Sequence, residues 1–274
     1  RDYFNVSTAI AVSPESGIGT VNTIRNTKFE TTFTGEVGLR GNYSTIFNYA
    51  MEVSPVDESN LNQSLIIVTP NTIDYGGITE MWTDGSAIAF CPLSEDSYPY
   101  DARGIIQHEA GGHGFGKLGD EYIYHNTFID FCDCTCCEHV FEFNIAKSLG
   151  WYENLSLTGK MHEVPWSHLI FDDRYSDVVD IYEGGFMHAR GVFRSEQNSC
   201  MNNNISYYNA ISREAIVKRI MEYAGESYSF EKFVENDKRD VVNSLSRSAE
   251  RSGVTVRGNQ YAPRIHKGKP DILK

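Results

Sequence analysis

The sequence predicts an α+β fold in which strands come first and helices dominate the end of the chain. β-branched and apolar runs separated by turn residues fill residues 1–100. A helix with a capping aspartate begins near residue 101, and helical periodicity returns after residue 210. We therefore expect a strand-rich lobe that ends in one helix, followed by a second lobe that ends in several.

The composition argues against two classes of protein. The chain has 274 residues, with 37 Asp and Glu against 24 Lys and Arg, and a net charge of -13. Surfaces that bind nucleic acid are basic, so we expect no nucleic-acid partner. No apolar run reaches about 18 residues, so the sequence predicts no transmembrane segment. The chain begins with RDYFNVSTAI, which lacks a signal-peptide pattern and resembles the interior of a longer precursor.

Apolar segments predict the strands of the first lobe. Residues 64–71 (SLIIVTPN) contain a continuous apolar run typical of a buried strand, and residues 21–33 are rich in β-branched residues. Residues 75–92 hold two short runs joined at Asp84-Gly85, a pair that favours a tight hairpin. We expect residues 85–90 (GSAIAF) to form an edge strand.

Capping residues delimit the first helix. Asp101 is the predicted N-cap. Ile105 and Ile106 are expected to face the core, and Gly114 and Gly116 to end the helix.

The second lobe, residues 123–274, is less regular. Gly150 is predicted to close one helix, and a longer helix is predicted from a Ser212 cap to Gly225. The helical pattern continues through residues 229–251, and the remainder is expected to be an extended tail or final strands. We expect this lobe and residues 1–122 to form one catalytic unit with a cleft between them.

Six cysteines raise the question of disulfides. Four of them crowd into FCDCTCCEH, which permits disulfides, a second metal site that involves His139, or reduced thiols. Disulfides are the first expectation, with Cys91 or Cys200 as further partners. The six are Cys91, Cys132, Cys134, Cys136, Cys137 and Cys200.

The segment QHEAGGHGFGKLGDEY, residues 107–122, resembles the zinc-binding pattern H-E-x-x-H with one residue too many. His108 and His113 are five apart, and such positions on a regular helix lie roughly 140° apart and cannot reach one ion. A π-bulge absorbs one inserted residue. Gly111 and Gly112 ease this distortion, although they cost a regular helix about 2 kcal/mol together. We predict a bulged helix whose two histidines bind Zn²⁺.

The remaining chemistry needs a base and a third ligand. Glu109 follows the first histidine, where a general base for the attacking water must lie. Asp120 is the predicted third ligand, because Gly116 and Gly119 let the chain fold back toward the metal. Three other acids remain alternatives, namely Glu121, Glu138 and Glu142.

HEAGGHGFGKLGDEY, followed by YEGGFMHARGVFRSEQNSCM, resembles the IgA-peptidase family of secreted bacterial zinc metallopeptidases. The resemblance covers roughly residues 1–225, and both segments occur in the family's order. Better-known members are similar to metzincins. The resemblance therefore implies a metzincin-like fold, with a twisted mixed sheet packed on the active-site helix. It also implies a secreted or cell-surface bacterial protein.

The same resemblance implies the roles of individual residues. His108 and His113 correspond to ligands and Glu109 to the base. Asp120 corresponds to the third ligand, one residue later than in metzincins. Met201 corresponds to the methionine of the turn beneath the metal, whereas composition alone predicts a core methionine.

Other polar residues have weaker signals. Arg194, Tyr207 and Tyr208 precede or follow Met201 closely and could stabilise an oxyanion, but packing or surface roles are the expectation. Six further histidines show no ligand spacing and are predicted to be structural or exposed. They are His125, His139, His162, His168, His188 and His266.

These patterns favour a zinc-dependent endopeptidase that hydrolyses a protein or peptide substrate. The main alternative is a catalytically inactive zinc-binding surface module that binds a host protein or glycan, and a third is another zinc hydrolase such as an amidase. Glu109 favours an enzyme, because an inactive relative would tolerate its loss. The immunoglobulin substrate in the family name is not extended to this chain, and the sequence does not indicate an oligomeric state.

Overall fold

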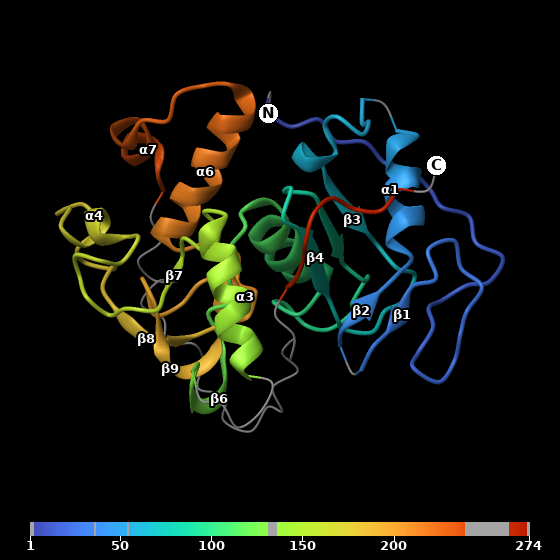
Figure 1. Ribbon diagram of the computed structural model, residues 1–274, viewed down its shortest axis with the longest axis horizontal. Coiled ribbons are helices and arrows are strands. Elements are labelled where there is room, and N and C mark those ends of the chain that lie inside the picture. The colour runs from blue at the N-terminus through green and yellow to red at the C-terminus, as the bar shows by residue number, and fades with distance from the viewer. Residues whose placement is uncertain (1–2, 36, 54, 131–135, 239–262, 273–274) are drawn as a thin grey trace. The chain divides into compact units, whose positions relative to one another are not determined.

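The computed structural model describes residues 3–35, 37–53, 55–130, 136–238 and 263–272, with the backbone alone for residues 136–138. The chain divides into two compact units. The first comprises Arg1–Phe115 with Arg257–Lys274, and the second comprises Gly116–Val256. Both contain helices and mixed β-structure, which confirms the α+β class (Figure 1).

The first unit is built from short strands and helices. In chain order it contains β1 (Thr32–Phe33), β2 (Leu39–Arg40), α1 (Tyr43–Met51), the 3₁₀ turn η1 (Leu61–Gln63), β3 (Leu65–Val68), β4 (Ile78–Trp82), β5 (Ala87–Phe90), α2 (Ala102–Ile105), the π-helix η2 (Ile106–Phe115) and β10 (Arg264–His266). Its larger sheet has the strand order β10-β4-β5-β3.

The predicted strand in residues 64–71 and the predicted hairpin are both present in this sheet. β3 lies in the predicted apolar run, but it is an edge strand with Ile67 45% exposed, so the expectation of a buried strand there is wrong. β4 and β5 form the predicted antiparallel hairpin. The expectation that residues 85–90 form an edge strand is wrong. β5 lies inside the sheet because β3 pairs with it in parallel on its other side.

The last described strand closes the opposite edge of the sheet. β10 pairs in parallel with β4, and Figure 1 shows it as the red segment beside that strand. The sequence analysis assigned these residues to the second lobe. Glu80 explains the attachment, because its buried carboxylate lies 3.1 Å from Arg264 Nη1 and 2.7 Å from His266 Nε2. The Tyr43 hydroxyl donates to the same carboxylate.

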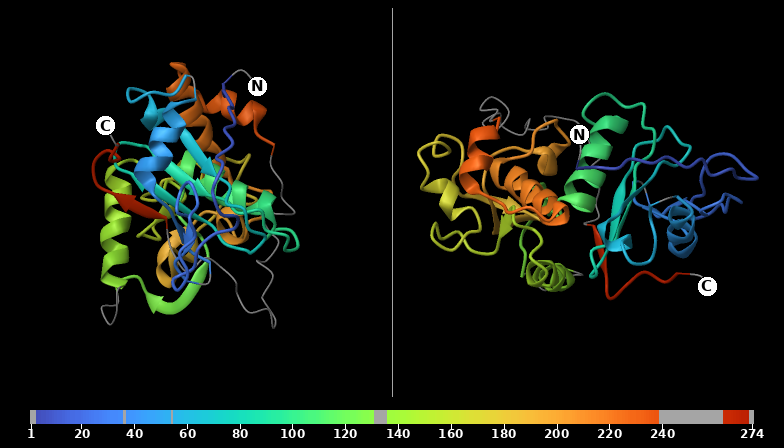
Figure 2. Two further views of the ribbon diagram at one scale, coloured as in Figure 1. Left: turned by 90° about the vertical axis from the view of Figure 1, so that its right-hand side faces the viewer. Right: turned by 90° about the horizontal axis from the view of Figure 1, so that it is seen from above.

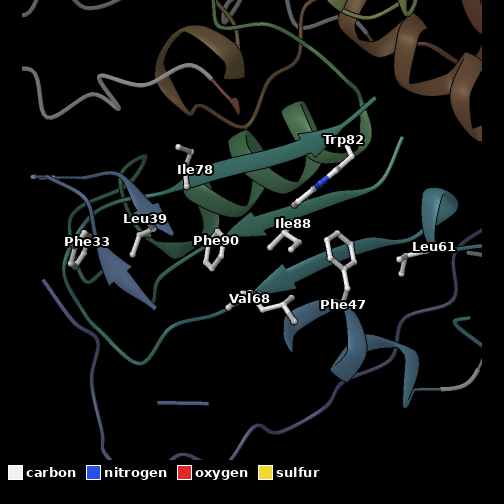
Figure 3. Packing of buried hydrophobic residues seen from close by; sticks show 10 residues of the cluster. Phe33, Leu39, Phe47, Leu61, Val68, Ile78, Trp82, Ile88 and Phe90 are labelled. Carbon is white, nitrogen blue, oxygen red and sulfur yellow. The ribbon is translucent and has the colours of Figure 1, made fainter. Parts of the chain in front are cut away.

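The two faces of the sheet pack against different helices (Figure 2, right). Ile88 and Phe90 of β5 belong to a large apolar cluster with Phe47 of α1 (Figure 3). Ala89, between them in sequence, packs with Ile105 on the side of η2. This alternation is expected for a strand, in which successive side chains point to opposite faces. α1 itself was not predicted; Asn42 caps it by accepting from the Thr45 amide.

The helix that leads into the histidine motif begins as predicted. The Asp101 side chain accepts a hydrogen bond from the Gly104 amide and caps α2. Ile105 is buried, but Ile106 is 39% exposed, so the expectation that both face the core is wrong. Successive residues on a helix point about 100° apart, and only the first of the pair points at the sheet.

The second unit is less regular, as predicted. In chain order it contains β6 (Ile123–Phe128), α3 (Cys136–Ser148), β7 (Leu155–Ser156), α4 (Ser167–Ile170), β8 (Tyr182–Gly185), β9 (Met187–Arg194), α5 (Cys200–Asn203), α6 (Ala210–Ala224) and α7 (Phe230–Asn236). β9 pairs in parallel with β6 and antiparallel with β7 and β8. None of the described helices is long and apolar enough to cross a membrane.

The helix ends of this unit partly follow the sequence signals. Gly150 follows α3, and Gly225 ends α6 with φ of +69°. Ser212 is not the cap of α6. Asn209 is, and it accepts from the Ser212 amide. The predicted helical pattern of residues 229–251 is described only as far as residue 238.

A buried acid next to α6 makes the stability of the fold dependent on pH. Glu196 accepts from the Tyr207 hydroxyl and the Ala210 amide, and burial raises its pKa to about 7. The unfolded chain releases this proton near pH 4.5 and the folded chain near pH 7, so folding becomes less favourable as the pH rises through this window.

We therefore expect Glu196→Gln, which mimics the protonated acid, to become more stable relative to wild type by up to about 3 kcal/mol between pH 4.5 and pH 8. Urea unfolding at several pH values measures this difference, and Glu222→Gln on the exposed part of α6 is the control. A difference that does not vary with pH would contradict the assignment.

Candidate metal centre

The widened helix η2 brings the two histidines of the motif together. Its ten residues, Ile106–Phe115, form π-turns rather than a single bulge. His108 and His113 are both buried, and their Nε2 atoms are 3.1 Å apart. The rings are nearly perpendicular, with an interplanar angle of 82°. The predicted convergence across the five-residue gap is therefore present.

Asp120 completes a group of three donors. One ligand atom each from His108, His113 and Asp120 lies within 4.8 Å of the other two, and all three residues are buried. Two nitrogens held by one tetrahedral zinc ion at about 2.05 Å would lie about 3.3 Å apart, close to the spacing here. An N–H···N hydrogen bond would give a similar distance for the two rings alone. The carboxylate beside them is the feature that makes the group suitable for a cation.

Glu109 is buried against β4. The Thr79 hydroxyl lies 3.0 Å from Glu109 Oε2 and 2.8 Å from the Glu109 carbonyl oxygen. A Cβ atom on Gly77 would lie 3.0 Å from Glu109 Oε1, so the absence of a side chain there leaves room for the carboxylate. Burial, followed by the charge of Glu109, raises the pKa of the nearby Cys91 thiol.

We expect Thr79 to position this carboxylate. If Glu109 is the base that the sequence predicts, Thr79→Val should lower kcat for peptide hydrolysis by roughly 10- to 100-fold, the equivalent of one hydrogen bond to a charged group, with little change in KM. Thr79→Ser keeps the hydroxyl and should restore most of the rate. Steady-state kinetics at matched zinc content measures this, and equal rates for the valine and serine variants would contradict it.

Several backbone contacts hold the segment that carries Asp120. Asn154 binds Gly119 twice, because its Oδ1 accepts from the Gly119 amide at 2.9 Å and its Nδ2 donates to the Gly119 carbonyl at 2.8 Å. A Cβ atom on Gly119 would lie 2.6 Å from Leu155 Cδ1, so any larger residue there would force the Leu155 side chain to move. The left-handed residue of this segment is Lys117, with φ of +52°, and neither of the two predicted glycines has that conformation.

Glu121 is part of this support and is not a member of the ligand group. Its buried carboxylate accepts from Asn154, Asn209 and Ser199 at 2.8, 2.7 and 2.5 Å. Burial raises its pKa, and these hydrogen bonds oppose the rise. Each hydrogen bond to a carboxylate contributes about 1.5–3 kcal/mol, so Glu121 fixes the backbone next to Asp120.

Met201 is connected to the same segment. The Glu121 amide donates to the Met201 carbonyl at 2.8 Å, and the Asp120 carbonyl accepts from the Phe186 amide at 2.8 Å. The Met201 side chain is fully buried in α5. The backbone on both sides of the Asp120 side chain is thereby fixed before any ion binds.

The other candidate residues have different roles. Arg194 donates to the carbonyls of Glu183 and Gly184, and Tyr207 donates to Glu196. Tyr208 interacts with the Cys200 thiol. These contacts agree with the expected packing roles.

The remaining predictions on acids and cysteines are only partly described. Glu142 is half-buried. Burial, then the charge of Asp120 and then that of Glu142 raise the pKa of Tyr152. The side chain of Glu138 and the cluster Cys132–Cys137 lie outside the described residues. Cys91 and Cys200, the proposed further disulfide partners, are present as buried thiols.

No protein-family model and no curated protein matches the chain. The chemistry of the site is therefore argued from its donors. Two imidazoles and one carboxylate suit Zn²⁺, and the same set also binds other first-row divalent ions such as Fe²⁺. Three protein donors leave coordination positions for water and substrate. A buried glutamate next to the first histidine in sequence favours hydrolysis over the other reactions of such a centre.

Proposed function

We propose that this chain is a zinc-dependent endopeptidase of metzincin-like fold. The observation that carries the proposal is the 3.1 Å approach of His108 and His113 in a helix widened by one residue per turn, with Asp120 beside them. A regular helix would have separated these rings, and the buried glycine at position 112 makes the widening less costly.

Each residue of the site has a separate role in the proposed reaction. His108, His113 and Asp120 would hold the ion, and zinc, when bound, lowers the pKa of water to near 7 and polarises a peptide carbonyl. Glu109 accepts the proton of the attacking water on its carboxylate and returns it to the leaving amine. Thr79 lies within hydrogen-bond distance of Oε2 of that carboxylate and would position it.

Two further observations support the fold and family in this proposal. A mixed sheet packs on the helix that carries the histidines, and Met201 is joined through its carbonyl to the residue after Asp120. The segments HEAGGHGFGKLGDEY and YEGGFMHARGVFRSEQNSCM resemble the IgA-peptidase family in the same order. A protein or peptide substrate follows from the proposed family and reaction.

Metal removal tests the proposal. We expect the zinc-loaded chain to cleave internal bonds of an unfolded protein or a peptide library, and dialysis against a chelator to reduce the rate by about 100-fold or more. Re-addition of Zn²⁺ should restore it, whereas Mg²⁺ should not, because imidazole ligands favour zinc. Mass spectrometry of the products measures both the cleavage and its position.

Other outcomes have defined meanings. Zinc bound by His108, His113 and Asp120 without hydrolysis of any library would overturn the enzyme and favour the alternative of an inactive zinc-binding module. Release of single terminal residues would overturn the endopeptidase in favour of an exopeptidase. Activity restored by Fe²⁺ with oxygen uptake would assign the same three donors to a different reaction.

A further inference from the structure

Three histidines of the second unit that are not members of the group His108, His113 and Asp120 lie close to one another. His188 on β9 is fully buried, and its Nε2 lies 3.0 Å from Nδ1 of His139 on α3. The two rings are steeply inclined, with centroids 5.3 Å apart and an interplanar angle of 70°. This spacing of ring nitrogens is nearly that of the pair in η2, 3.1 Å.

The other ring nitrogen of His188 is already engaged. Its Nδ1 lies 3.1 Å from the hydroxyl oxygen of Thr127 on β6. A histidine that binds a metal through one nitrogen almost always uses the other for such a hydrogen bond, which fixes the tautomer and the orientation of the ring. With Nδ1–H donated to Thr127, the lone pair of Nε2 points toward His139.

Strand pairing brings the third histidine to the same face. His125 of β6 is the register partner of His188 in the parallel β6–β9 pair, and residues opposite each other across a sheet share a face. Their ring centroids are 5.7 Å apart. His125 is exposed, so a rotamer change that turns its ring toward the pair meets little resistance.

The backbone before His188 has an unusual conformation. Phe186 and Met187 are consecutive non-glycine residues with left-handed φ values of +46° and +68°. Such residues cost about 1–2 kcal/mol each, and they persist where surrounding contacts fix them. Here the amides of both residues donate to the carbonyls of Asp120 and Tyr122. The turn sends His188 into β9 in the register that faces His125.

From these contacts we propose that His139 Nδ1 and His188 Nε2, with His125 as third donor, form a second site for a divalent transition metal that prefers imidazole, such as Zn²⁺. The set carries no negative charge, which separates it from the Asp120-containing centre and disfavours Mg²⁺ and Ca²⁺. Among the described residues, three donor atoms meet within 4.8 Å only at residues 108–120, so this second site forms when His125 turns inward.

Zinc stoichiometry tests the proposal independently of any peptidase activity. In reduced protein equilibrated with a zinc buffer, wild type should bind about two ions per chain and the variant His108→Ala/His113→Ala about one. Adding His139→Gln to that double variant should remove the remaining ion, while His162→Gln, an exposed histidine stacked on Phe171, should not.

A second measurement guards against a variant that fails to fold. Zinc should raise the thermal midpoint of the His108→Ala/His113→Ala variant, and His125→Ala should weaken that zinc response by about 10-fold or more in midpoint concentration. The proposal is overturned if the double variant binds no zinc, or if its ion remains after His139 is replaced in a folded protein. If the double variant binds no zinc, the contacts among Thr127, His188 and His139 are hydrogen bonds without a metal.

Discussion

Replacing Glu109 by glutamine is expected to lower kcat/KM for peptide cleavage by about 10²- to 10⁴-fold while zinc content stays unchanged. Glutamine has the same shape and can still accept from Thr79 through its amide oxygen, so the helix and the histidine pair keep their geometry. Only the ability to take and return a proton is lost.

The zinc content of wild type and of Glu109→Gln must be measured together with their rates. The control is the same Glu-to-Gln change at an exposed position. Glu222→Gln on α6 removes the same charge at an exposed place and should leave the rate unchanged. Cleavage by Glu109→Gln at the wild-type rate, with full zinc, would show that another group serves as the base. A loss of zinc in this variant would instead place Glu109 among the ligands.

Replacing Asp120 by asparagine is expected to weaken zinc binding by more than about 100-fold, beyond the range found for residues that support a ligand indirectly. The amide is nearly isosteric but neutral, so the ion loses its only anionic protein donor in the group of three. The Asp120 carbonyl, which accepts from the Phe186 amide, is untouched. Competition with a chromophoric chelator measures the change in Kd.

Glu121→Gln is the matched control for this experiment. Its amide NH₂ would face one of the donors Asn154, Asn209 or Ser199, so we expect a loss of about 1–3 kcal/mol of stability with little change in zinc Kd. The opposite pattern, with zinc lost from Glu121→Gln and retained by Asp120→Asn, would move the third ligand by one residue.

The part of the site that lies in one helix was predictable from spacing. A five-residue gap between His108 and His113 is compatible with one ion only if the helix widens, and the two glycines inside the gap make widening less costly. The structure extends this widening over the whole of η2, which a prediction of one bulge did not anticipate.

The supports of the site were not predictable. Thr79 lies thirty residues before Glu109, and Asn154 lies thirty-five residues after Gly119. A threonine in a strand and an asparagine in a loop have no spacing rule that connects them to a distant motif, because strand pairing and chain reversal decide which residues meet. The contact between His139 and His188 was not predicted for the same reason, since the two residues are forty-nine apart in sequence.

The fold prediction was correct where a local sequence signal determines the element, and wrong where contacts between distant residues determine it. Asp84-Gly85 sets the β4–β5 hairpin by itself, so that element was predictable. The place of β5 inside the sheet depends on its pairing with β3, which no local signal encodes. Asn209 and Ser212 are both good capping residues, and only tertiary contacts select the first of them.

The parallel strand β10 has a consequence for the order in which the polypeptide matures. During synthesis, residues 116–256 leave the ribosome before residues 264–266. Until β10 emerges, β4 is an unpaired edge strand of the sheet formed by β3, β4 and β5. At this stage the Glu80 carboxylate has no contact with Arg264 or His266. An unpaired edge strand can form backbone hydrogen bonds with a strand of another molecule. Fragments that stop short of residue 264 should therefore self-associate through β4 more readily than chains that include β10.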